Sequence, residues 1–378
     1  MAPELDHYPG LLRNLFDTPE IEIVKEPSDD HYIVHVSYYR ISSSLYNRSR
    51  KNPQYNNIGS YAIGFFEDRI SEDLKNNRAT LLITNDVDTI KISGVLNLLA
   101  ILLDFGIPKQ SLIYVDSNPW LEKTLLRHGY QGFYYSWVDE LFTVDYISDI
   151  SDKIDTLAAR DKKFLFFGGK PRPHRVEFLK HCFERIPNFE QDSFVSIGSN
   201  PVVGKKTLDV IDNWVSKLYK TTDEFCTPWD QVYHEISYEY HTNSYWNISP
   251  STQYYYEPDR ISVNEKQYKS IVALQPFIFL AEPKMLEFIK NQGYKTFSKW
   301  IDESYDSTPC DATRMNKIVE EVKKLNNLSH SDLSTMLKDM LPILRHNAEL
   351  YMTIANQKRV KPDLISNLRR FVKNESAM

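Results

Sequence analysis

Short apolar runs alternate with segments of helical length along this chain, and this alternation constrains its fold more than any other feature. In a first series, the apolar run 79–86 is followed by an apolar segment at 91–105 and a second run at 111–116. A second series begins with the apolar run 163–167 and continues to about residue 310. Strands that alternate with helices form parallel sheets covered by helices. The sequence therefore predicts two consecutive α/β units.

The two series are separated by the charged stretch 150–162, which we interpret as the connection between domains. A length of 378 residues agrees with two domains at roughly 150 residues each. We expect an N-terminal α/β domain at 1–160 and a second α/β domain at 163–310. The remaining residues show helical spacing of apolar side chains, so 311–378 is predicted to be a helical tail.

Local signals indicate where helices of the first series begin and end. Asn118 precedes Pro119, the order of an N-cap residue followed by proline in the first helical position. Gly129 stands where the glycine after a helix belongs, and Gly106 follows the apolar segment 91–105. These residues predict one helix that ends at Gly106 and another between Asn118 and Gly129.

Composition excludes several classes of protein. With 42% hydrophobic and 25% charged residues, the chain has ample apolar surface, which excludes a disordered chain. Its three cysteines form no CxxC pair, which favours a reducing compartment over a disulfide scaffold or a zinc site. The first residues lack a signal-peptide pattern, and the most apolar run, 92–105, is interrupted by Asn97 and Asp104. We therefore expect a cytoplasmic protein without a membrane partner.

The net charge of −6 disfavours a protein whose main role is to coat nucleic acid, because such proteins are usually basic. The end of the chain differs from the whole. From Arg345 onward, seven Lys and Arg residues accompany three Asp and Glu residues, a local charge of +4. This segment fits either contact with a DNA backbone or an ordinary basic helix docked on an acidic protein.

A glycine- and base-rich turn, GGKPRPHR, occupies 168–175 between a predicted strand and a predicted helix. Backbone amides of such a turn and of a helix start favour an anion. Lys170, Arg172 and Arg175 add positive charge around His174, and two prolines restrict the loop. The spacing matches neither a P-loop nor GxGxxG. The turn therefore predicts either a phosphate site of another kind or a solvated basic loop.

A second candidate anion site lies at a predicted helix start. Asn264 is a plausible N-cap, and Gln267 three residues later completes a capping-box pattern. Glu265 and Lys266 would then lie in the first turn, where a cation opposes the helix dipole unless an anion is bound there. The alternatives are an anion site and an ordinary surface pair.

Two acids, Asp86 and Asp88, follow directly after the predicted strand 79–85. The carboxyl ends of strands are where open α/β sheets bind ligands. Such a pair can hold a divalent metal on a nucleotide diphosphate, supply a general base, or cap the next helix. The sequence leaves these three alternatives open.

Aromatic residues are concentrated between the predicted strands and helices of the second unit. They fit either stacking on a base or a sugar, or rigid packing of a long loop. The members of this aromatic run are Tyr233, Tyr238, Tyr240, Tyr245, Trp246, Tyr254, Tyr255 and Tyr256.

Taken together, several segments resemble a family of viral and bacterial glycosyltransferases. The segment KFLFFGGKPRPHRVEFLKHCF at 163–183 resembles that family's strand, PHR turn and helix. The segments ISVNEKQYKSIVALQPFIFL at 261–280 and MLEFIKNQGYKTFSKWIDESYD at 285–306 resemble its ITEKTYKPI, QPFI, GFKTF and IDESYD block. More distantly, this block is similar to the donor-binding helix of α1,3-fucosyltransferases. The resemblance covers about 163–310, with a weaker echo in 79–130.

The resemblance implies a GT-B-like fold of two Rossmann-like domains, in which the second domain mainly holds a nucleotide-diphosphate sugar. It implies that Glu265 accepts hydrogen bonds from the donor ribose and that Lys266 meets the diphosphate. Arg172 and Arg175 would neutralise phosphate charge as the nucleotide leaves, and Asn264 stands where the family commonly has Thr. The predicted donor-binding residues are Lys170, His174, Asn264, Glu265 and Lys266.

The predicted reaction transfers a sugar to an acceptor hydroxyl. GT-B enzymes generally stabilise the leaving group with basic side chains and a helix start, so we expect no metal and no cofactor beyond the donor substrate. The base is expected from the first domain, from Asp86 or Asp88; with Arg172 and Arg175 these form the predicted catalytic set. The acceptor is a protein, a glycan or a modified DNA base, in the host cytoplasm if the protein is viral.

One departure from the family pattern supports an alternative. Where relatives often carry a Ser-x-x-[ST]-E run, residues 248–253 read ISPSTQ and lack the acid. This favours a catalytically inactive relative that binds a nucleotide or glycan as an interaction module. A third interpretation is a metal-dependent GT-A enzyme that uses Asp86 and Asp88 with manganese.

Overall fold

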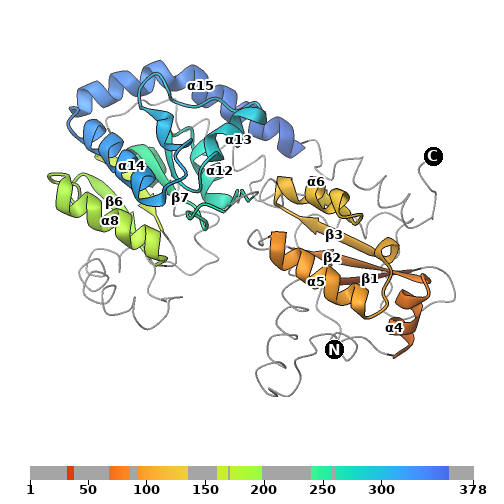
Figure 1. Cartoon of the computed structure of the whole chain (residues 1–378). Coiled ribbons are helices and arrows are strands. Elements are labelled where there is room, and N and C mark those ends of the chain that lie inside the picture. The colour runs from red at the N-terminus through yellow and green to blue at the C-terminus, as the bar shows by residue number, and fades with distance from the viewer. Residues whose placement is uncertain are drawn as a thin grey trace. The chain divides into compact units, whose positions relative to one another are not determined.

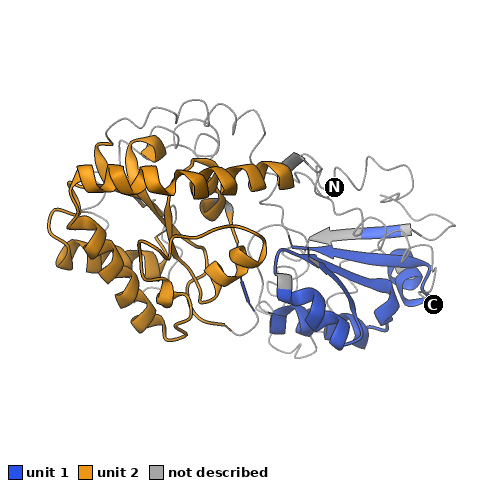
Figure 2. Ribbon diagram, turned by 90° about the horizontal axis from the view of Figure 1, so that it is seen from above, with its two compact units in different colours: residues 1–140, 258–262, 358–378 blue, residues 141–257, 263–357 orange. Residues whose placement is uncertain are grey.

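The computed structural model describes residues 32–37, 68–85, 92–134, 160–168, 171–197, 240–257, 260–261 and 263–356. The chain forms two compact units, coloured in Figure 2. Unit 1 comprises residues 1–140, 258–262 and 358–378, and unit 2 comprises 141–257 and 263–357. Asp86, Asp88, Lys170 and the side chain of Glu265 lie outside the described residues, as do 150–159 and the last part of the tail, 357–378.

Unit 1 contains a four-stranded parallel sheet in the order β1-β2-β3-β4. The strands are β1 (Tyr32–Ser37), β2 (Ala79–Thr84), β3 (Leu112–Asp116) and β4 (Gln131–Tyr134). Its helices are α4 (Asp68–Lys75), α5 (Ile92–Asp104) and α6 (Pro119–Arg127), with a 3-10 turn, η2, at Lys109–Ser111. Both β2 and β3 are buried along their whole length, as expected for strands covered on two faces.

The core of unit 1 forms where α5 packs on the sheet. Val95, Leu98, Leu99 and Leu102 are buried, at the spacing of one helix face. Burying each such leucine contributes about 1.5–3 kcal/mol relative to exposure. The predicted helix ends are confirmed: Gly106 has φ +85° and Gly129 has φ +74°, and the Asn118 side chain accepts from the backbone N–H of Trp120 at 3.1 Å.

Unit 2 contains a second four-stranded parallel sheet, in the order β6-β5-β7-β8. The strands are β5 (Lys162–Phe167), β6 (Ser193–Ser196), β7 (Ser244–Pro250) and β8 (Phe277–Leu280). The helices in its described residues are α8 (Pro173–Arg185), α12 (Glu265–Val272), α13 (Met285–Asn291), α14 (Asp311–Asn326) and α15 (His330–Asn356), with a 3-10 turn, η4, at Glu303–Tyr305. Figure 1 shows these helices around the sheet.

The C-terminal helices α14 and α15 are part of unit 2. Buried residues recur along α14 at Met315, Ile318, Val319 and Val322, which is the spacing of one helix face. Along α15, Leu333, Leu337, Met340, Leu344, Ala348 and Tyr351 are buried. The expected fold class, two Rossmann-like α/β units with a C-terminal helical tail, is confirmed. The domain boundaries at 160, 163 and 311 stay predictions.

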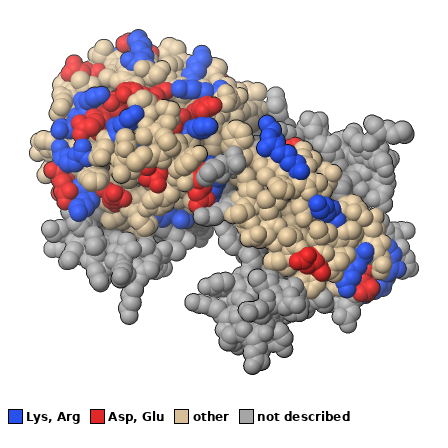
Figure 3. All heavy atoms as spheres, viewed as in Figure 1, with Lys and Arg blue, Asp and Glu red and all other residues tan. Residues whose placement is uncertain are grey.

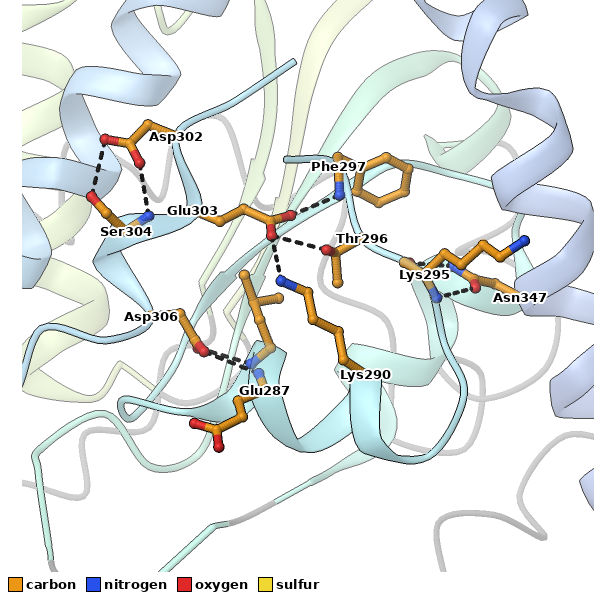
Figure 4. A network of polar contacts seen from close by, with 11 residues as sticks. Glu287, Lys290, Lys295, Thr296, Phe297, Asp302, Glu303, Ser304, Asp306 and Asn347 are labelled. Carbon is orange, nitrogen blue, oxygen red and sulfur yellow. Dashed lines mark hydrogen bonds and ion pairs between the residues drawn. The ribbon is translucent and has the colours of Figure 1, made fainter. Parts of the chain in front are cut away.

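The segment that resembles the family's IDESYD block is held by a network of polar contacts, shown in Figure 4. The Glu303 carboxylate accepts from Phe297 N at 2.7 Å, from Thr296 Oγ1 at 2.9 Å and from Lys290 Nζ at 2.8 Å. Glu303 is therefore satisfied by three partners from 290–297 and fixes the turn between α13 and η4.

A second acid of the same block caps α13. Asp306 accepts from the backbone N–H groups of Leu286 and Glu287 at 2.8 and 3.0 Å. Asn347 of α15 exchanges two 2.8 Å hydrogen bonds with the backbone of Lys295, which ties the long helix to this segment. The block that carries part of the resemblance is thus a structural element of unit 2.

No helix among the described residues is long and apolar enough to cross a membrane.

Candidate functional site

The strand order of unit 2 creates a topological switch point between β5 and β7. The chain leaves β5 through α8 toward β6, on one side, and leaves β7 through α12 toward β8, on the other. Right-handed crossovers then place α8 and α12 on opposite faces of the sheet (Figure 1). In open α/β sheets, ligands bind outside the carboxyl ends of strands at such a point. Here these ends lead into 168–175 and 251–264.

Arg175 joins the two strand ends. Its side chain is buried, with 2% of the residue exposed. Nη1 donates to the carbonyl of Gly168, after β5, and Nη2 donates to the carbonyl of Ser251 at 2.8 Å and of Pro250 at 3.4 Å, at the end of β7. The guanidinium therefore cross-links β5 and β7 and places a positive charge beneath the switch point.

His174 also contacts the end of β7. Its Nε2 lies 3.1 Å from the Ser251 carbonyl oxygen, so Nε2 carries the hydrogen and donates. The ring stacks on Tyr254, with centroids 5.2 Å apart and planes at 13°. Burial, followed by the neighbouring Arg175 charge, lowers the pKa of His174 to about 3. The imidazole is therefore neutral at physiological pH and positions the start of α8 without adding charge.

Asn264 places the start of α12 at the same edge. Its side chain accepts from Lys266 N at 3.0 Å, and its own N–H donates to Gln267 Oε1 at 3.0 Å, which confirms the predicted capping box. Its Nδ2 donates to Ser251 Oγ at 3.3 Å and to Thr252 Oγ1 at 3.4 Å.

Ser251 is the residue at which these contacts meet. Its carbonyl accepts from Arg175 and His174, and its hydroxyl accepts from Asn264. Three predicted site residues from two distant segments thus lie together. Sequence reasoning did not single out Ser251, because its position after a strand is significant only once β7 is known to lie beside β5.

Two half-buried cations lie at the two helix starts. Arg172 is the N-cap residue of α8. Lys266 is the second residue of α12. Each helix N-terminus carries a partial positive charge, to which these side chains add formal charge. The arrangement is chemically suited to an anion such as a phosphate group.

The predicted aromatic run divides into buried and exposed members. Tyr245 and Trp246 are buried in β7, so they belong to the packing of the sheet. Tyr254 is buried against His174 and Arg314, whose guanidinium carbon lies 4.4 Å from the ring centroid. Tyr255 and Tyr256 remain exposed, while Tyr233 and Tyr238 lie outside the described residues.

A buried acid that sequence reasoning missed lies at the carboxyl end of β3 in unit 1. Asp116 accepts from Asn85 Nδ2 at 2.8 Å, Tyr114 Oη at 3.3 Å and Asn118 N at 2.7 Å. Burial raises its pKa to about 7, and these hydrogen bonds oppose the shift. The available signal was its position as the last residue of the apolar run 111–116.

From the raised pKa of Asp116, we expect the free energy of unfolding of unit 1 to fall as the pH rises. Its pKa is 3.8 in the unfolded chain and about 7 in the folded chain. Between these values the folded state keeps a proton that the unfolded state has released, so the free energy of unfolding falls with increasing pH. Asp116→Asn removes the buried charge and should raise this free energy above pH 7 by about 1–2 kcal/mol.

Hydrogen–deuterium exchange of β2 and β3 at pH 5 and pH 8, corrected for intrinsic exchange, would measure this effect. Asp339→Asn, at an exposed acid of α15, is the control. Protection in unit 1 that falls equally with pH in the wild type and in Asp116→Asn would contradict the assignment.

No protein-family model and no curated protein sequence matches this chain. Among solved structures, it is similar to the N-terminal domain of Candida albicans trehalose-6-phosphate phosphatase, with a TM-score of 0.45 and 9% identity over 92% of this chain and 73% of that one. It is also similar to alpha,alpha-trehalose 6-phosphate synthase from Burkholderia multivorans, with a TM-score of 0.38 and 9% identity over 90% of this chain and 72% of that one. At these values, neither similarity assigns an activity to the chain.

Proposed function

We propose that the chain is a glycosyltransferase that moves a sugar from a nucleotide-diphosphate sugar to an acceptor hydroxyl without a metal. One observation carries this proposal: the basic turn after β5 and the capped start of α12 meet at Ser251, at the switch point of unit 2. A ligand there would face two helix starts, together with Arg172 and Lys266. A diphosphate is an anion that such a site stabilises.

The proposed reaction breaks the bond between the anomeric carbon and the phosphate oxygen of the donor. The nucleoside diphosphate leaves with that electron pair, and Arg172, Lys170 and Lys266 stabilise its negative charge. Glu265 would accept from the ribose hydroxyls. The acceptor oxygen forms the new bond and gives its proton to a base, for which we propose Asp86 or Asp88. Arg175 would act mainly as a positioning residue, because it already binds backbone carbonyls.

Lys266→Ala should weaken binding of nucleoside diphosphates at least tenfold and leave nucleoside binding nearly unchanged. The reason is that the proposed partner of Lys266 is phosphate, and a charge-assisted hydrogen bond contributes roughly 1.5–3 kcal/mol. Calorimetric titration of the full chain with the four common nucleoside diphosphates and their nucleosides would measure this difference. Lys323→Ala, at a half-buried lysine in the last turn of α14, is the matched control.

Two outcomes of these titrations would contradict the proposal. If the wild type binds no nucleotide, the proposed donor site is wrong. If Lys266→Ala causes equal small losses of affinity for nucleoside diphosphates and nucleosides, Lys266 is an ordinary surface residue. A parallel assay of donor hydrolysis in EDTA tests the metal. Loss of activity that manganese restores would favour the metal-dependent interpretation at Asp86 and Asp88.

A catalytically inactive binding module is the second candidate, because Gln253 ends the run where relatives often carry an acid. In the structure, the Gln253 N–H donates to Ser251 Oγ at 3.2 Å, so this segment still shapes the switch point. The two candidates differ in turnover. Nucleotide binding without release of a nucleoside diphosphate from any nucleotide-sugar, tested with protein, glycan and DNA acceptors, would favour the binding module.

The acceptor class is proposed as a protein, a glycan or a modified DNA base. On the face seen in Figure 3, the described acidic and basic side chains are interspersed over unit 2. Some lysines of unit 2 are engaged in ion pairs, such as Lys290 with Glu303 at 2.8 Å and Lys324 with Glu321 at 2.5 Å. The described side chains of this face therefore do not form the basic surface that a DNA backbone requires. A DNA acceptor would have to bind to another surface.

A further inference from the structure

An exposed tyrosine adjoins the switch point of unit 2. Tyr255 is 46% exposed, although most large aromatic rings in the described part of this unit are buried. Its ring centroid lies 5.8 Å from that of His174 and 5.7 Å from that of Tyr254, with planes at 89° and 81°. We call these three residues, His174, Tyr254 and Tyr255, the aromatic shelf.

The aromatic shelf leaves almost half of Tyr255 exposed. The His174 and Tyr254 centroids are 5.2 Å apart, so the three centroids form a nearly equilateral triangle. Both neighbours therefore contact Tyr255 from the same side. Because 46% of Tyr255 stays exposed beside these two rings, the residue is accessible to a planar ligand.

The aromatic shelf is held in place before any ligand binds. Tyr254 donates its hydroxyl to the Asp311 carbonyl at 2.6 Å and packs under the Arg314 guanidinium. The residue after Tyr255 is also anchored, because the Tyr256 N–H donates to Asp311 Oδ1 at 3.0 Å. Because both sequence neighbours of Tyr255 are anchored, a ligand that stacks on it pays less for ordering the loop.

The aromatic shelf lies next to the proposed phosphate site. His174 is the second residue of α8, directly after the turn that carries Arg172. A planar group on Tyr255 would therefore lie beside the group that Arg172 contacts. In a nucleotide, the planar base is joined to the phosphates through one ribose, which matches an anion site bordered by an aromatic ring.

We propose that the exposed ring of Tyr255 stacks on the nucleobase of the donor. This inference rests on the proposed function, in which the diphosphate of the same donor binds at the switch point. Stacking tolerates any base, since every base has a π-face. Tyr255 therefore contributes to affinity for nucleotides in general, while contacts to the base edges would set the choice among them.

Tyr255→Ala should weaken binding of the best-bound nucleoside diphosphate about tenfold and leave inorganic pyrophosphate binding unchanged. Tyr255→Phe keeps the ring and should bind within twofold of the wild type. The matched control is Tyr256→Ala, because this neighbouring tyrosine is 48% exposed. Calorimetry on the full chain measures all four, after a melting curve has shown that each variant is folded.

The outcomes separate this inference from the proposed function. If the wild type binds nucleoside diphosphates and Tyr255→Ala binds them equally well, or weakens pyrophosphate in parallel, the stacking inference is overturned and the donor site stands. Equal losses in Tyr255→Ala and Tyr256→Ala also overturn it. If the wild type binds neither nucleotides nor pyrophosphate, the proposed function and this inference both fall.

Discussion

Arg314→Ala is expected to lower the free energy of unfolding of unit 2 by about 3–5 kcal/mol. Arg314 is 1% exposed. It donates to the carbonyls of Ala281 at 3.1 Å, Thr308 at 2.9 Å and Tyr254, and it pairs with Asp311 at 2.6 Å. Removing the guanidinium takes a donor away from each of these carbonyls, and a buried group left unsatisfied costs about 1–3 kcal/mol.

Urea unfolding of the full chain, followed by a probe in unit 2, would measure this loss. Arg314→Lys keeps the charge but cannot reproduce the planar fork, so it should restore only part of the stability. Arg345→Ala, at an exposed arginine of α15, should change the free energy of unfolding by no more than about 0.5 kcal/mol. A loss below about 1 kcal/mol in Arg314→Ala would contradict the structural role inferred from these contacts.

Arg175→Met is expected to have the second large effect, a loss of about 2–4 kcal/mol in the stability of unit 2. Methionine keeps much of the length and apolar volume of the side chain and removes the donors. The carbonyls of Gly168, Pro250 and Ser251 then lose their cross-link at the ends of β5 and β7. Hydrogen–deuterium exchange should show reduced protection in β7 and in the first turn of α8.

Arg172→Met is the matched control for Arg175→Met. Arg172 lies half-buried at the N-cap of α8, whereas Arg175 is 2% exposed, so Arg172→Met should lower stability less than Arg175→Met. Under the proposed function, the same change should weaken nucleoside-diphosphate binding about tenfold. Similar stability losses in both variants would show that the two arginines are not divided into a positioning residue and a phosphate-binding residue.

Much of the fold could be predicted because its signals are local. The parallel sheets follow from apolar runs without alternation, separated by segments of helical length. The caps at Asn118 and Asn264 depend on side chains that reach a backbone N–H two residues away, and Gly129 depends on its own φ. Each of these signals acts over a few residues, so the amino-acid order is enough to read it.

The candidate site could be predicted only in part from such local signals. The sequence identified the basic turn, and it identified Asn264 with the two residues that follow it. It could not show that Arg175 turns inward to backbone carbonyls, because those carbonyls include two about 75 residues away. For the same reason, Asp116 was missed: its raised pKa comes from burial, with Asn85, directly after the neighbouring strand β2, as a partner.

The sequence by itself thus determined the alternation of strands and helices, where several helices begin and end, and which residues bring charge to the turn after β5. Only the tertiary structure decided the order β6-β5-β7-β8, and with it the switch point at which Ser251 meets residues from α8 and α12. The physical reason is the range of the interactions. Propensity and capping act between near neighbours in the chain, whereas strand order and burial depend on which distant segments pack together.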